Sequence, residues 1–134
     1  MTVKEYLSQA YYIDREIDSK IEIMDKLNAL AMKTTPTMSD MPGSPNRNIH
    51  KTEDIIVKIM DLENEITERI DYLVDLKRDI YVLINKVKNP DYRMLLELRY
   101  LCFRKWEEIA VEMNMEISWV HKLHKRALSS VDFR

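Results

Sequence analysis

The stretch YRMLLELRYLCFRKWEEIAVEMNMEISWVHKLHKRALSSV, residues 92–131, decides the fold of this 134-residue chain. Its pattern predicts three short helices. The first, 92–101, has leucines three residues apart, and the second, Trp106–Met113, repeats apolar residues at the i, i+3, i+4, i+7 spacing of one helix face. Asn114 follows, and Asn tolerates the left-handed backbone that a tight turn after a helix needs.

A third helix is expected over 118–131, because the Ser118 hydroxyl can accept an otherwise unpaired backbone N–H at the start of a helix. Its two faces differ in chemistry. Hydroxyl-bearing and cationic side chains lie on one side, and no acidic residue occurs from 117 to 131. Apolar side chains gather on the other side: Val120, Leu123, Ala127 and Val131. A helix, a tight turn and a second helix, with a supporting helix in front, form the helix-turn-helix arrangement.

The outward face of the third helix suits the major groove of double-stranded DNA. Lys and Arg neutralise phosphates, and short polar groups reach base edges. A solvated surface helix can carry the same charges, but the preceding turn and helix favour the DNA-binding interpretation. For Trp119, packing is preferred over stacking on bases, and contact with a backbone phosphate or a thymine methyl group is the alternative. The candidate DNA-contacting residues are Arg104 and Lys105 at the entry to the second helix, and Ser118, Trp119, His121, Lys122, Lys125 and Arg126 in the third.

The segment 95–128 resembles the C-terminal DNA-binding region of bacterial sigma factors, called region four. The resemblance rests on the LxLRY run at 96–100, the EIA triplet at 108–110, Ser118, and the V-x-x-L-x-x-x-A-L spacing that starts at Val120. Asn114 stands where Gly is usual in that region. Nothing upstream resembles the sigma regions that grip the polymerase core or melt the promoter. The resemblance therefore implies a regulator that borrows this module, with RNA polymerase as a further candidate partner.

The whole chain, from residue 1 to 131, also resembles a family of small uncharacterised proteins encoded by phages and prophages of Gram-positive bacteria. Relatives of that family include phage late-operon transcription activators with the same kind of C-terminal domain. This wider resemblance implies a transcription regulator of phage or prophage origin.

Upstream of residue 89, two long amphipathic segments predict helices that pair along their length. Val3–Ala31 and Thr52–Lys88 both carry apolar residues at alternating steps of three and four, with a slip at Arg69 in the second. The segment 33–51 holds three of the four prolines and the single Gly, so we expect a loop there. A disordered linker is preferred over a binding loop for it. Asp91 is the expected cap of the helix that follows.

The expected fold is all-α. A long antiparallel two-helix coiled-coil hairpin (1–88) is followed by a small helix-turn-helix domain (89–134). Because two helices give a thin core, a homodimer is expected through the hairpin, at residues such as Ile17 and Ile66. The alternative is that the C-terminal module covers the remaining apolar surface.

Composition limits the function classes. The net charge is -2, so the basic signal is local rather than general. One Cys excludes an internal disulfide and fits a reducing cytoplasm, and no signal segment or membrane span is expected. A single Gly could not build a phosphate-binding or dinucleotide-binding loop, so we expect neither an enzyme nor a cofactor. His121, His124 and Cys102 lack a fourth ligand for zinc, and no metal site is expected.

Two function hypotheses remain. The first is a DNA-binding transcription regulator. The second is a coiled-coil protein-interaction adaptor whose sigma-like module no longer binds DNA. Salt-dependent binding to DNA separates them.

Overall fold

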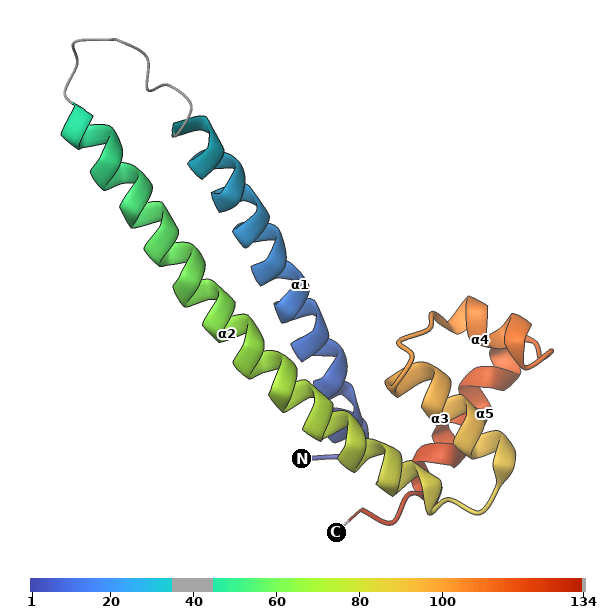
Figure 1. Ribbon diagram of the computed structural model, residues 1–134. Helices are drawn as coiled ribbons and strands as arrows, with labels where there is room; N and C mark the ends of the chain where they lie inside the picture. Colours follow the sequence, from blue (N-terminus) through green and yellow to red (C-terminus); the bar gives the residue numbers. More distant parts are fainter. Residues whose placement is uncertain (35–44, 134) are drawn as a thin grey trace. The chain divides into compact units, whose positions relative to one another are not determined.

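The computed structural model describes residues 1–34 and 45–133, and its regular structure within these ranges is helical throughout. The prediction of an all-α fold is therefore confirmed. The helices are α1 (Val3–Thr34), α2 (Pro45–Asn85), α3 (Pro90–Tyr100), α4 (Trp106–Glu112) and α5 (Ile117–Ser130) (Figure 1). Among the described residues, no helix is long and apolar enough to span a bilayer.

The boundaries of the two long helices differ from those predicted. α1 continues to Thr34 and α2 begins at Pro45, so the prediction of a loop over 33–51 is wrong at both ends. Pro is compatible with the first turn of a helix, because the N–H that it lacks has no partner there in any case. The remainder of the predicted loop, 35–44, lies outside the described residues. α2 ends at Asn85, three residues before the predicted end.

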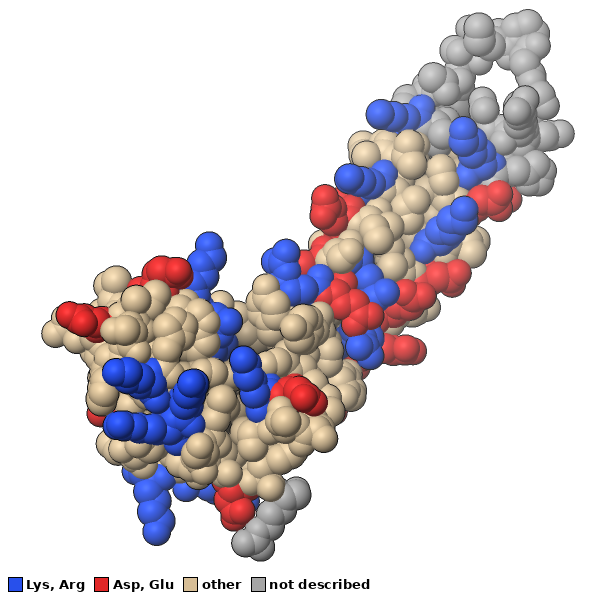
Figure 2. Space-filling model, turned by 180° about the vertical axis from the view of Figure 1, so that it is seen from behind, with Lys and Arg blue, Asp and Glu red and all other residues tan. Residues whose placement is uncertain are grey.

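The chain divides into two compact units, 15–71 and 1–14 with 72–134. Within the first unit, α1 and α2 run antiparallel, since Glu16 contacts Arg69 while Lys20 contacts Glu65. The buried side chains of this unit belong to the predicted stripes: Ile17, Ile55, Ile59 and Ile66. Acidic and basic side chains are interspersed along the outer surface of the long helices (Figure 2).

Arg69 explains the slip in the apolar stripe of α2. Its guanidinium donates two hydrogen bonds to the Glu16 carboxylate, at 3.0 and 2.8 Å. Both side chains are about 40% exposed, so the pair contributes at most about 1 kcal/mol of stability. The contact joins the turn of α2 that carries Arg69 to the turn of α1 that carries Glu16.

The second unit has its own core, which draws on both ends of the chain. Leu7 and Ala10 from α1, and Ile80 and Ile84 from α2, have no exposed surface. The same holds for apolar side chains of the C-terminal helices: Leu95, Leu96, Ile109, Val120 and Ala127. The predicted domain boundary between 88 and 89 stays a prediction. The unit that contains α3–α5 also takes core side chains from the first turns of α1 and from the last turns of α2.

The loop between α3 and α4 is tied into this unit by an aromatic side chain. Phe103 has φ 57, a left-handed conformation that is uncommon for a bulky residue. Its ring centroid lies 5.7 Å from that of Tyr11, and the Lys77 ammonium lies 4.6 Å from it. The loop therefore packs against α1 and α2 within the same unit.

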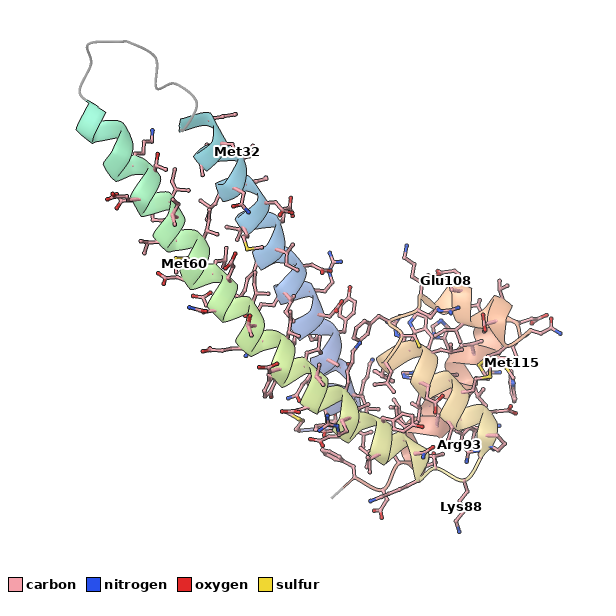
Figure 3. The ribbon with its side chains drawn as sticks, in the orientation of Figure 1. Met32, Met60, Lys88, Arg93, Glu108 and Met115 are labelled. Atoms are coloured by element: carbon pink, nitrogen blue, oxygen red, sulfur yellow. The ribbon has the colours of Figure 1, made fainter. Side chains whose placement is uncertain are left out.

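Asn89, and not the predicted Asp91, caps α3. The Asn89 side chain accepts the backbone N–H of Asp91 at 2.9 Å and that of Tyr92 at 3.3 Å. Pro90 occupies the first helical position and keeps the residue before it extended, so the cap falls on Asn89. Arg93 then donates to the carbonyls of Val87 and Lys88, at 2.7 and 3.1 Å, and holds the α2–α3 linker (Figure 3).

Candidate nucleic-acid interface

The turn between α4 and α5 has the geometry that the sequence predicted. Asn114 has φ 53, in the left-handed region, and its N–H donates to the Val111 carbonyl at 3.1 Å. The N–H of Met115, labelled in Figure 3, donates to the Ala110 carbonyl at 2.9 Å. These two bonds close a Schellman motif, in which a left-handed residue ends the helix and satisfies its last carbonyls. The chain can therefore start a new helix almost at once.

The start of α5 differs from the prediction. Glu116 precedes the first turn, and its carbonyl accepts the N–H groups of Trp119 and Val120, both at 3.0 Å. Ser118 lies inside the first turn, so the prediction that it is the N-cap is wrong. Because the Schellman turn ends at Met115, the helix begins one residue earlier than the best capping side chain. Ser118 is nevertheless exposed, as its assignment to the outer face requires.

The side chains on one side of α5 are buried, and those on the other side are exposed. Val120, Leu123 and Ala127 are buried, and α5 contacts both α3 and α4. The predicted contact residues of α5 are exposed on the other side: Ser118, Trp119, His121, Lys122, Lys125 and Arg126. Several Lys and Arg side chains lie on the C-terminal part in the view of Figure 2, with Asp and Glu mainly at its margin. α5 itself contains no acidic residue.

A buried hydrogen bond connects α3 with α5. The Tyr100 hydroxyl lies 2.6 Å from Nε2 of His124, and both side chains are buried. Burial lowers the pKa of His124 to about 4, and the nearby charges of Lys4, Arg99 and His121 act in the same direction. Burial also raises the pKa of Tyr100 to about 12. At neutral pH both groups are therefore uncharged, and they share one hydrogen bond whose donor is set by the tautomer of the imidazole.

The two histidines of α5 have different surroundings. His121 is exposed with the lysines, whereas His124 is only 7% exposed and belongs to the core. In 1–34 and 45–133, no three His, Cys, Asp or Glu side chains are grouped so that they could hold a metal ion. The Tyr100–His124 bond was not predicted from the sequence. The residues are 24 positions apart, and no local pattern links them.

Trp106 is partly buried among side chains of the C-terminal helices. The Arg99 guanidinium lies 4.3 Å from the Trp106 ring centroid and also donates to the Arg104 carbonyl at 2.9 Å. The His121 and His124 rings lie 4.9 and 4.6 Å from the Trp106 ring. Trp106 thus supports α5 from α4.

The two predicted phosphate contacts before α4 differ in their pairing. The Arg104 guanidinium lies 3.1 Å from the Glu112 carboxylate, so a phosphate would compete with that side chain. Because both side chains are about 40% exposed, this ion pair contributes at most about 1 kcal/mol to stability. It therefore does not prevent Arg104 from contacting a phosphate. Lys105 is exposed, and its backbone N–H donates to the Glu108 carboxylate at 3.3 Å. Glu108 therefore stabilises the start of α4.

A family model described as Protein of unknown function (DUF1492) matches residues 33–132, well over half of the chain. No curated protein matches the chain, and no solved structure does so either.

Proposed function

The chain belongs to the DUF1492 family, and we propose that it is a DNA-binding transcription regulator of phage or prophage origin that binds the major groove through α5. One observation carries the proposal. In a chain of net charge -2, α5 exposes Lys122, Lys125 and Arg126 with no acidic residue in the helix, while its opposite side is buried. The resemblance of 95–128 to sigma region four supports the same conclusion.

The arrangement of α5 fits the dimensions of DNA. Its 14 residues span about 21 Å, and the major groove, about 12 Å wide, admits one helix. Ser118 and His121 are exposed in the first half of the helix, where side chains reach base edges. Lys122 and Lys125 then neutralise phosphates, which supplies affinity but little sequence preference.

The long helices serve self-association in this proposal. Ile17 and Ile66, which the sequence assigned to the dimer contact, are 6% and 7% exposed within the hairpin, so that assignment is wrong. Exposed apolar side chains of α2 take their place. Ile56 and Ile70 are 14 residues apart, two heptads on the same helix face, and they are 46% and 41% exposed. RNA polymerase remains the other candidate partner of the long helices.

Sedimentation tests the dimer separately from DNA binding. The double variant Ile56→Glu/Ile70→Glu is expected to be monomeric at concentrations where the wild type is a dimer. Both residues are exposed, so each monomer should keep its helical circular dichroism. A wild type that stays monomeric at every concentration removes the dimer from the proposal.

The DNA-binding proposal is tested by fluorescence anisotropy with duplexes from the protein's own genome region across a salt series. The double variant Lys122→Ala/Lys125→Ala is expected to bind more weakly, with a slope of log K against log salt that is smaller by roughly one unit per lost phosphate contact. The double variant Lys26→Ala/Lys58→Ala removes the same charge from the long helices and serves as the control. It should keep the wild-type slope.

Folding should survive in both variants, because all four lysines are exposed. If the α5 variant binds its best duplex with unchanged affinity and slope, α5 does not enter the groove. The adaptor hypothesis then replaces DNA binding.

A further inference from the structure

Trp119 is a large apolar side chain of α5, and contact with phosphates gives it no role. It is 41% exposed, although Trp is highly buried on average in folded proteins. It follows Ser118 in the first turn, where side chains of a groove-binding helix approach base edges. Lys122 and Arg126, three and seven residues later, lie on the same side of the helix.

The indole ring of Trp119 is held in place on the surface. The Arg126 guanidinium lies 5.2 Å from the ring centroid, within the range of a cation–π interaction. One part of the ring is thereby covered by a cation, and the part that stays exposed is an apolar surface. The same guanidinium and the Lys122 ammonium carry the positive charge that attracts phosphates to this side of the helix.

The major groove offers few apolar groups. Base edges there present hydrogen-bond donors and acceptors, with one exception, the C5-methyl group of thymine. An apolar side chain that faces the groove gains most when it covers this methyl group, because any other edge would lose its hydrogen bonds to water.

We propose that Trp119 contacts a thymine methyl group and makes the protein prefer an A·T pair opposite the first turn of α5. This assignment rests on the proposed binding of DNA by α5. It names Trp119 as a residue that selects sequence, whereas Lys122 and Lys125 provide affinity for any duplex.

The test uses two duplexes that differ only in methyl groups. The first is a duplex that the full-length protein selects from a random pool, and the second has deoxyuridine in place of every thymidine. The wild-type protein should bind the deoxyuridine duplex about fourfold more weakly, the effect of exposing one buried methyl group. The protein is identical in both measurements, so its folding cannot cause the difference.

Two variants then assign the methyl contact to a residue. Trp119→Ala should bind the thymidine duplex about as weakly as the wild type binds the deoxyuridine duplex, and it should not distinguish the two. Lys122→Ala should bind both duplexes more weakly but keep the fourfold preference. Circular dichroism verifies that Trp119→Ala retains its helices.

The possible failures are distinguishable. If the wild type selects no duplex, or if its binding does not depend on salt, the proposed function is overturned and the Trp119 contact with it. If salt-dependent binding is present but the two duplexes bind equally, only the Trp119 assignment is overturned. The same holds if Trp119→Ala keeps the preference for thymidine.

Discussion

Loss of stability in mild acid is the expected consequence of the neutral His124. An imidazole has a pKa of about 6.5 in an unfolded chain, and burial lowers the pKa of His124 to about 4 in the folded state. Between these two pH values the unfolded state binds more protons than the folded state. The free energy of unfolding is therefore fully retained above pH 6.5, and it falls as the pH drops towards 4.

The two pKa values determine the size of this effect. Their difference corresponds to about 3 kcal/mol of unfolding free energy, a large part of the total for a small domain. A variant that lacks the titrating imidazole of His124 and keeps every other titratable group isolates this effect.

His124→Gln provides this comparison. The Gln side-chain amide can accept a hydrogen bond from the Tyr100 hydroxyl or donate one to it, and it does not titrate. Urea unfolding followed by circular dichroism, from neutral pH down to about pH 4, should show a loss for the wild type that exceeds the loss for His124→Gln by about 3 kcal/mol. If the wild type and His124→Gln lose stability in parallel, the neutral buried imidazole is not the cause.

Three further variants test the packing. Leu123→Ala should lower the free energy of unfolding by about 2–5 kcal/mol because Leu123 is 6% exposed, and urea titration measures this against wild type. Asn114→Ala should cost about 1 kcal/mol because φ is 53 at this position, whereas Asn114→Gly should cost nothing in the same titration. The double variant Ile17→Asp/Ile66→Asp should unfold the long helices, seen as a loss of helical circular dichroism; an unchanged spectrum would contradict their burial.

Local sequence patterns were sufficient to predict which segments are helical and to predict the turn at Asn114. Apolar side chains at the i, i+3, i+4, i+7 spacing predict a helix, because burial of the stripe that they form provides most of the stability of the helix. Asn114 could be assigned to a left-handed turn because few residue types tolerate that conformation. The ends of helices were predicted less well. Pro45 and Ser118 have strong local preferences, but α2 begins at Pro45, seven residues before the predicted start at Thr52, and α5 has Glu116 rather than Ser118 at its N-cap.

The sequence by itself therefore determined an all-helical chain, the helix-turn-helix segment and the cationic face of α5, since each depends on residues a few positions apart. The tertiary structure alone decided which polar side chains are partnered. Arg69 is hydrogen-bonded to Glu16, 53 positions away in the sequence, and Tyr100 is hydrogen-bonded to His124, 24 positions away. It also separated His124 from His121, although both lie on the same short helix. Burial and hydrogen bonding at such separations depend on how distant segments pack, and no local spacing specifies that.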